Sequence, residues 1–371
     1  MRLLVTTQAI DLNDPALGFF HRWIEEIATQ FTAVEVVCLR EGRHVLPGNV
    51  RVYSLGKPSF AQATKGTGAR AVQRMRYVWR FYRLLWQLQG RYDAVFVHMN
   101  PEYAVLGGPV WRITGKRLIL WYTHRNVDLK LRLAMLFAHA VATAAPESLR
   151  IKSSKVHVIG HGIDTAAFTT SPRLRSTGAA ARDGTLHDPI ALITVGRITP
   201  IKRLEILLDA LALLNARGVK VSLSIVGAPT VASDQAYEEK LRAKTASLGV
   251  EGIVRFVGAV PYREMPVVYG AHDISVNLAP TGGIDKAVLE SMASGCLVLV
   301  ANRAFAPLLG PDAELLLVEP TGASLAEKLT KLLALPRSDR RALAERLVHR
   351  ARQEADISVV VDRLIALIEG P

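Results

Sequence analysis

The residues best suited to chemistry lie in one stretch of the chain, which reads PTGGIDKAVLESMASG from Pro280 to Gly295. Short apolar runs flank this stretch, so the pattern predicts a strand, a loop, a helix and a second strand. Gly282 and Gly283 allow a tight turn that brings backbone N–H groups close to a ligand. A helix that begins at about Lys286 directs its positive N-terminal end to the same place, and this combination favours a phosphate group.

Glu290 lies four residues after Lys286 and therefore on the same face of the predicted helix. A carboxylate one turn into such a helix can accept hydrogen bonds from two ribose hydroxyls, as the acidic residue of a dinucleotide-binding fold does. The stretch therefore predicts a nucleotide site, although Gly-Gly loops before helices are common.

A second motif, GRITPIKR, is cationic and runs from Gly196 to Arg203. It lies before the Pro280–Gly295 stretch in the chain. It follows a predicted strand, Ile190–Val195, and leads into a predicted helix, Lys202–Ala216. Arg197 and Lys202 flank a Pro-containing turn, and because Arg binds phosphate oxygens with a planar fork and Lys as a point charge, the two suit a diphosphate. A strand, turn and helix with solvated charges is the alternative interpretation.

These motifs, in this order and at this separation, resemble those of the sugar-nucleotide glycosyltransferases of family 4, which have the GT-B fold. GRITPIKR is similar to the family's Gly-Arg-x4-Lys signature, and GIDKAVLESMASG is similar to the half-motif that ends in Glu-Ala-Met-Ala-x-Gly. HGIDTAAF, from His161 to Phe168, is similar to the Asn-Gly-Val-Asp-x3-Phe junction between the family's two domains. The resemblance is strong from about residue 155 to 320 and weaker in the N-terminal half.

The resemblance implies a retaining transferase that uses a nucleotide-diphosphate sugar and needs no metal or other cofactor. The chain shows no convincing Asp-x-Asp pair, so two cations and the helix dipole beyond the Gly-Gly loop would stabilise the leaving diphosphate. His124 would orient the sugar. The expected catalytic residues are His124, Arg197, Lys202 and Asp285. The expected donor-binding residues are Gly18, Gly196, Arg197, Lys202, Gly282, Gly283, Ile284, Asp285, Lys286 and Glu290.

One departure from the family pattern concerns its first glutamate. The family motif has two glutamates separated by seven residues; Glu290 is the second, and Gly282 stands where the first would be. Asp285, in place of the loop's usual second glycine, is the candidate to serve instead. Arg203, in place of the usual Gly after Lys202, adds a cation near the expected diphosphate.

In the N-terminal half, the candidate residues rest on strand order. Gly18 lies in the loop after the first predicted strand, where it either lets the backbone approach a ligand or merely starts a helix. His124 ends the predicted strand LILWYTH, and the family places a sugar-contacting His at the end of an equivalent strand. His98 is its competitor, and His161, in place of the junction Asn, is expected to be structural.

Length and composition are consistent with two α/β domains, because half of the 371 residues are hydrophobic. No apolar run reaches the ~18–20 residues of a membrane span, and Leu131–Ala145, which contains Arg132 and His139, reads as a buried helix. The first residues predict a strand and not a signal peptide. Cys38 and Cys296 lie in separate predicted strands, which favours a reducing, cytoplasmic location.

Alternating apolar runs and helical patterns predict two Rossmann-like, doubly wound parallel-sheet domains that face each other across a cleft. We expect an acceptor-binding domain at residues 1–170, a nucleotide-sugar domain at 188–354, and a final helix at 355–371 that packs on the first domain. Thr169–His187 is the expected linker. The remaining predicted strands are Leu3–Thr7, Val34–Leu39, Val50–Ser54, Tyr92–His98, Leu118–Tyr122, Val156–Ile159, Val221–Val226, Val254–Val257, Ile274–Leu278, Leu297–Ala301 and Leu315–Val318. The remaining predicted helices begin at about Ala16, Pro101 and Asp128 or span Ala71–Gln89, Ser324–Leu335, Arg337–Glu354 and Ile357–Glu369.

Charge is concentrated in the N-terminal half, where residues 1–180 hold 24 Lys and Arg against 11 Asp and Glu. The helix predicted at Ala71–Gln89 carries an apolar stripe beside an arginine stripe. Three interpretations remain open: packing on its own sheet, binding to an anionic membrane surface, and binding to nucleic acid, which nothing else in the chain supports. The apolar stripe is Val72, Met75, Trp79, Tyr82 and Trp86, and the membrane-surface candidates are Arg76, Trp79, Arg80, Arg83 and Trp86.

The sequence thus predicts a retaining transferase that builds a cell-envelope glycan or glycolipid, in the cytoplasm or peripherally on the inner face of the membrane. An inverting transferase or sugar-nucleotide epimerase would need a carboxylate base, for which Asp14 and Glu102 are the plausible positions. A non-catalytic scaffold that binds nucleotide sugar or membrane is the third alternative.

Overall fold

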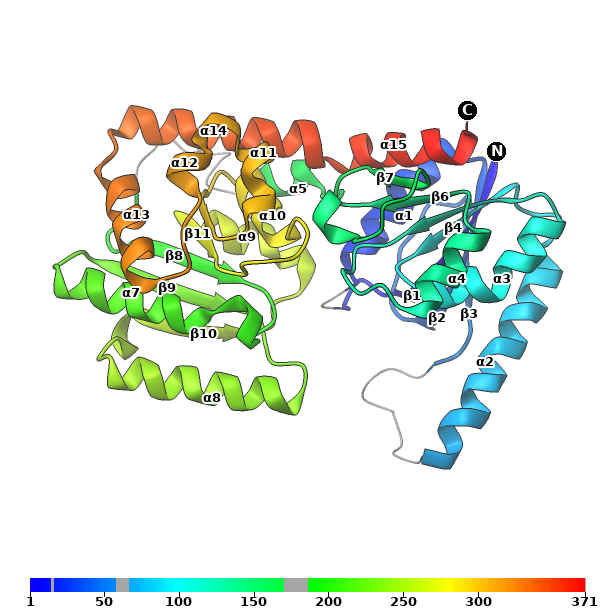
Figure 1. Cartoon of the computed structure of the whole chain (residues 1–371), viewed down its shortest axis with the longest axis horizontal. Coiled ribbons are helices and arrows are strands. Elements are labelled where there is room, and N and C mark those ends of the chain that lie inside the picture. The colour runs from blue at the N-terminus through cyan, green and yellow to red at the C-terminus, as the bar shows by residue number, and fades with distance from the viewer. Residues whose placement is uncertain (15–16, 58–66, 170–185, 371) are drawn as a thin grey trace. The chain divides into compact units, whose positions relative to one another are not determined.

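The computed structural model describes residues 1–14, 17–57, 67–169 and 186–370. The chain forms two compact units, one made of Met1–Gly162 with Ile357–Pro371 and the other of Ile163–Asp356. Each unit is a parallel sheet with helices on both faces (Figure 1).

The first unit contains a seven-stranded sheet in the order β3-β2-β1-β4-β5-β6-β7. Helices α1 and α15 pack on one face, where Phe20 and Trp23 meet Val360 and Leu364. Helices α2, α3 and α4 pack on the other face. The strands are β1 Arg2–Ile10, β2 Ala33–Glu41, β3 Val50–Ser54, β4 Ala94–His98, β5 Arg117–Trp121, β6 Ala140–Thr143 and β7 Val156–Val158, and the helices are α1 Phe19–Gln30, α2 Thr67–Leu88, α3 Pro101–Ile113, α4 Leu129–Phe137 and α15 Ile357–Glu369.

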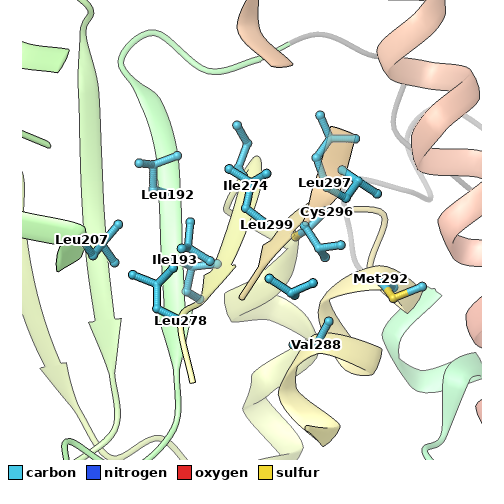
Figure 2. Close-up of a cluster of buried hydrophobic side chains, with 14 of the residues drawn as sticks. Leu192, Ile193, Leu207, Ile274, Leu278, Val288, Met292, Cys296, Leu297 and Leu299 are labelled. Atoms are coloured by element: carbon cyan, nitrogen blue, oxygen red, sulfur yellow. The ribbon is translucent and has the colours of Figure 1, made fainter. Parts of the chain in front are cut away.

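The second unit contains a five-stranded sheet in the order β10-β9-β8-β11-β12. Leucine, isoleucine and valine from β8, β11 and β12 pack against α7 and α10 (Figure 2). The strands are β8 Ile190–Val195, β9 Val221–Val226, β10 Val254–Gly258, β11 Ile274–Asn277 and β12 Leu297–Val300. The helices are α5 Thr165–Thr169, α7 Leu204–Ala216, α8 Ala232–Ser247, α9 Met265–Gly270, α10 Lys286–Ala293, α11 Ala306–Leu309, α12 Ala313–Leu316, α13 Gly322–Ala334 and α14 Arg337–Ala355.

The strand order places a topological switch point between β8 and β11. From β8 the chain moves outward through β9 to β10, then returns to the other side of β8 as β11. Loops at the carboxyl ends of two such strands run in opposite directions and leave a crevice between them, where α/β sheets bind ligands. The loop after β8 carries Gly196–Lys202, and the loop after β11 carries Pro280–Asp285, so motifs far apart in sequence become neighbours.

Several predicted elements are wrong in detail. The apolar run Leu131–Ala145 is not one helix, because α4 ends at Phe137 and β6 then pairs with β5 and β7. Leu315–Val318 is not a strand: α12 occupies its start, and only an isolated bridge joins Leu317 to Val300. Short apolar runs are compatible with either state, and here packing decided the outcome.

The predicted helix start at Ala16 lies outside the described residues, and α1 begins at Phe19. Most of the predicted linker, Thr169–His187, also lies outside the part of the chain that the structure describes. No helix within the described residues combines the length and apolarity needed to cross a membrane.

Candidate functional site

The centre of the candidate site is an ion pair between Lys202 and Asp285, whose Nζ and Oδ2 atoms lie 2.5 Å apart. Lys202 ends a 3-10 turn, Pro200–Lys202, and does not start the long helix as predicted. Arg203 follows in the left-handed conformation (φ 49°), so α7 begins only at Leu204. This turn directs the Lys202 ammonium group towards the loop after β11.

Gly196 makes room for the Lys202 side chain. Its φ of +141° is accessible almost only to glycine. A Cβ atom at this position would lie 3.0 Å from Cε and 3.1 Å from Nζ of Lys202. Both observations explain why the motif begins with glycine, and they show that Gly196 shapes the lysine position as well as the turn.

Asp285 has three partners that fix its carboxylate. Besides Lys202, the Asn277 amide donates to Oδ2 at 2.8 Å, and the Ala287 backbone N–H donates to Oδ1 at 3.2 Å. The last contact makes Asp285 the N-cap of α10. Burial alone would raise the pKa of Asp285, but Lys202 and Asn277 outweigh it and lower the pKa to about 2. Asp285 is therefore ionised at neutral pH and holds Lys202 in place.

The Gly-Gly loop is anchored by a residue that sequence reasoning missed. The Asn302 amide donates to the carbonyls of Gly282, at 3.3 Å, and Gly283, at 3.1 Å. Gly282 has a φ of +130°, and no atom lies within 4 Å of a Cβ placed there, so its glycine is required by backbone conformation alone. Asn277 and Asn302 each lie at the carboxyl end of a predicted strand, which is the signal that could have identified them.

Glu290 is buried one turn into α10, with only 3% of its surface exposed. The Lys286 ammonium lies 3.2 Å from its Oε1, and the Tyr269 hydroxyl lies 3.3 Å from its Oε2. The Tyr262 ring packs beneath the same ammonium, 4.2 Å from Nζ to the ring centroid. Burial raises the pKa of Glu290, and the charge of Lys286 opposes this effect. A ribose can reach this carboxylate only if the neighbouring side chains move.

The remaining candidates in the second unit lie around this pair. Arg197 is exposed in the loop after β8 and forms no ion pair with the described residues. Ile284 is partly buried against the apolar core, and this contact fixes the end of the Gly-Gly loop. The site thus combines an exposed guanidinium, a fixed ammonium, a glycine loop and the N-terminus of α10, which together can bind an anion.

The histidine candidates belong to the first unit. His124 is exposed, three residues after β5 ends at Trp121, so it does not end the strand as predicted; its ring lies edge-on to Tyr122 at 5.5 Å. His98 does end a strand, but it is buried, stacks on Phe20 at 3.7 Å and contacts the Thr7 hydroxyl at 3.0 Å. Burial lowers the pKa of His98 to about 3, with a further contribution from His161, so the ring is neutral at pH 7.

Gly18 fits the structural alternative. Its φ is −56°, and a Cβ atom there would lie 2.6 Å from the Asp14 carbonyl oxygen, so the loop backbone packs tightly against it. His161 packs edge-on to Trp121 at 6.2 Å, within the first unit.

The two carboxylates considered as bases have other partners. Asp14 forms an ion pair with Arg40 and accepts a hydrogen bond from the Leu17 N–H at 2.9 Å. Glu102 forms an ion pair with Lys130 at 2.7 Å. Each carboxylate is therefore paired with a cation of the first unit. No group of three or more His, Cys, Asp or Glu side chains suited to a metal occurs among residues that the structure describes.

Comparisons with known proteins agree with the motif assignment. Residues 180–354 match the family described as glycosyl transferases group 1. A D-inositol 3-phosphate glycosyltransferase from Geodermatophilus obscurus is 30% identical over 148 residues, which is 39% of this chain and 32% of that protein. A putative colanic acid biosynthesis glycosyltransferase, WcaL, from Escherichia coli K12 is 25% identical over 282 residues, 74% of this chain and 56% of the relative. The chain thus spans between a third and just over half of these relatives.

The fold as a whole matches a solved structure. Alr3699/HepE from Anabaena, crystallised in complex with UDP, superposes with a TM-score of 0.72 at 19% identity, and the match covers 100% of both chains. These findings confirm the resemblance to the family 4 glycosyltransferases and the GT-B fold predicted from the sequence.

Proposed function

We propose that this chain is a glycosyltransferase that moves a sugar from a nucleotide-diphosphate donor to an acceptor. The observation that carries the proposal is the meeting of Arg197, Lys202 and the Gly282–Gly283 loop at the switch point between β8 and β11. A leaving nucleoside diphosphate carries negative charge that must be stabilised as the glycosidic bond breaks. Preorganised cations and backbone N–H groups supply this stabilisation without reorganising during the reaction.

The roles of the residues follow from their environments. Arg197 is exposed and can grip phosphate oxygens with two parallel N–H groups. Lys202 is held by Asp285, so it presents its charge at a fixed position. The N-terminus of α10, where Asp285 accepts from the Ala287 N–H, adds the partial positive charge of the helix dipole. Each charge-assisted contact is worth roughly 1.5–3 kcal/mol.

We further propose that Glu290 binds the ribose of the donor once Lys286 and Tyr262 move aside, and that the reaction retains anomeric configuration without a metal. His124 is the proposed sugar-orienting residue of the first unit. Asp285 is proposed to take the place of the missing first glutamate, chiefly by fixing Lys202. The ion pairs of Asp14 with Arg40 and of Glu102 with Lys130 support this scheme over an inverting one, because a cation beside a carboxylate makes it a weaker base.

The proposed acceptor is a cell-envelope glycan or a lipid-linked sugar, and the proposed location is the cytoplasm or the inner face of the membrane. The colanic acid name of the Escherichia coli relative supports this class of acceptor. UDP-glucose is the first donor to test, because Alr3699/HepE was crystallised with it.

The proposal is tested by incubating the protein with UDP-, GDP- and ADP-sugars, with and without a chelator, and measuring release of free nucleotide. We expect slow release from one donor, unaffected by the chelator and at least tenfold slower in Lys202→Ala. NMR of the released sugar then reports its anomeric configuration. Binding of a donor without any release, with or without candidate acceptors, would instead favour the non-catalytic scaffold.

A further inference from the structure

Helix α2 packs on its own sheet through a face other than the apolar stripe noted in the sequence. Phe81, Leu84, Leu85 and Leu88 point into the core of the first unit. The aromatic stripe read from the sequence lies outside this face. The helix thus packs on its own sheet, as one of the three interpretations has it, but a different set of side chains at helical spacing makes those contacts.

The stripe itself is exposed to solvent. Trp79 is 61% and Trp86 is 78% exposed, and Val72, Met75 and Tyr82 are exposed with them. Exposed tryptophans are costly in water, and contiguous apolar patches of this kind mark interaction sites. The patch lies on the helix shown in blue and cyan at the edge of the first unit (Figure 1).

Neighbouring helices extend the patch. Leu129, Leu133 and Leu136 form an exposed stripe on α4, and Ile113 is exposed at the end of α3. The three helices are linked: the Tyr82 hydroxyl of α2 donates to Leu106 of α3 at 2.9 Å, and Arg112 of α3 donates to Leu136 of α4 at 3.1 Å. More than half of the large apolar side chains that are exposed in the described residues lie on these three helices. We call them together the apolar surface.

The charges around this surface are positive. Helix α2 contains five arginines and no acidic residue. Arg76 and Arg83 are exposed, and Arg83 stacks over Trp79 at 5.1 Å. On α4, Arg132 is exposed and Lys130 lies beside Glu102. Arg80, a predicted membrane contact, instead donates to the Leu55 carbonyl at 2.7 Å and so anchors the helix.

We propose that the apolar surface binds an anionic lipid bilayer. Trp at the headgroup level, aliphatic side chains below it and arginines facing lipid phosphates are what an interfacial helix presents. Two other occupants fit less well. A symmetric second copy would bring identical arginines together, and nucleic acid would stack on the aromatic rings but leave Met75, Leu133 and Leu136 without partners.

This inference does not depend on the donor site, and the protein carries its own probe for it. Of its five tryptophans, Trp23, Trp111 and Trp121 are buried, so a polarity change at the surface is reported by Trp79 and Trp86 alone. We would titrate the chain of 371 residues with vesicles of phosphatidylcholine containing phosphatidylglycerol, and record tryptophan emission together with flotation of the protein.

We expect a blue shift and flotation with anionic vesicles, and little of either with pure phosphatidylcholine. Trp79→Phe with Trp86→Phe should abolish the blue shift while flotation persists. Trp79→Ser with Trp86→Ser should weaken partitioning by at least about tenfold, whereas Val231→Ser with Val267→Ser, exposed apolar residues of the second unit, should not. Arg76→Gln and Arg83→Gln should each weaken it about fivefold, unlike Arg217→Gln or Arg255→Gln.

Three results would overturn the proposal. One is the absence of both blue shift and flotation at every lipid composition, in protein whose circular dichroism is native. Another is a blue shift that grows with protein concentration in the absence of lipid, accompanied by dimer in sedimentation, because a second copy would then cover the surface. The last is a blue shift with single-stranded DNA that equals or exceeds the shift with anionic vesicles.

Discussion

Lys202 and Asp285, which come from loops after two adjacent strands, form an ion pair at the centre of the candidate site, with Nζ and Oδ2 2.5 Å apart. The pair joins the two sequence motifs directly. It also places a carboxylate beside Lys202 in a chain that has Gly282 at the position of the family's first glutamate. Asp285 reaches the lysine because it caps α10 and is turned by Asn277.

Removing the charge of Asp285 should lower the free energy of unfolding of the second unit. Asn also caps helices well, so Asp285→Asn isolates the ionic contribution, which we expect to be roughly 2 kcal/mol at neutral pH from the lowered pKa. Denaturant unfolding of wild type, Asp285→Asn, Lys202→Met and the double variant gives a coupling energy. Additive effects of the two substitutions would show that the pair does not stabilise the fold.

The same contribution should depend on pH. The pKa of Asp285 is lowered to about 2 from an ordinary value of 3.8, so the folded state favours the ionised form. The stabilisation is present above pH ~4 and is lost as the pH falls towards 2. The difference in unfolding free energy between wild type and Asp285→Asn should therefore shrink across this window. A difference that stays constant down to pH 2.5 would assign the stability to capping geometry.

The contribution of Glu290 to folding stability should change with pH in the opposite direction to that of Asp285. Burial raises its pKa, so the folded state favours the protonated carboxyl, and this stabilisation is lost as the pH rises through the folded-state pKa. Glu290→Gln resembles the protonated form at every pH. We expect it to melt at or above the wild-type temperature at pH 7, with the gap closing below pH ~4.5, while it binds nucleotide about tenfold more weakly.

Thermal scans at both pH values and a nucleotide titration check this prediction. A large loss of stability in Glu290→Gln at pH 7 would mean that the ion pair with Lys286 outweighs the cost of burying the carboxylate.

Gly196→Ala should damage the site more than the matched change Gly282→Ala. Both glycines have φ near +130° to +140°, so each substitution costs about 1–3 kcal/mol in backbone strain. Only at position 196 would the new methyl group press on Lys202, at 3.0 Å from Cε. We expect similar losses in melting temperature but a clearly larger loss of nucleotide affinity in Gly196→Ala. Gly218→Ala, with φ +73° and no neighbour within 4 Å, controls for strain alone.

The sequence predicted the order of most elements and the two motifs that meet at the candidate site, because glycine loops, cations and apolar strands have strong local signals. Backbone conformations and the ends of elements depended on tertiary contacts, which the sequence does not show. Nothing local shows that Arg203 adopts the left-handed conformation, or that Leu315–Val318 joins the sheet by a single bridge only. Asn277 and Asn302 were overlooked because their hydrogen-bond partners lie elsewhere in the chain. Asn277 donates to Asp285, and Asn302 donates to the carbonyls of Gly282 and Gly283.

The sequence left the buried face of α2 open for a related reason. Its sequence allows two apolar stripes, Val72 to Trp86 and Phe81 to Leu88, and the hydrophobic pattern alone does not rank them. The structure buries the stripe from Phe81 to Leu88, and this leaves Trp79 and Trp86 exposed.

The central claim, that Arg197 and Lys202 form a diphosphate site at this switch point, is tested most directly by calorimetric titration of UDP, GDP and ADP into wild type, Arg197→Ala and Arg217→Ala. Arg217 is an exposed arginine at the end of α7 and serves as the control. We predict that one nucleotide binds, and that Arg197→Ala weakens it roughly 10- to 150-fold while Arg217→Ala leaves it unchanged. Equal affinity in wild type and Arg197→Ala, or no binding of any nucleotide to folded protein, would contradict the account.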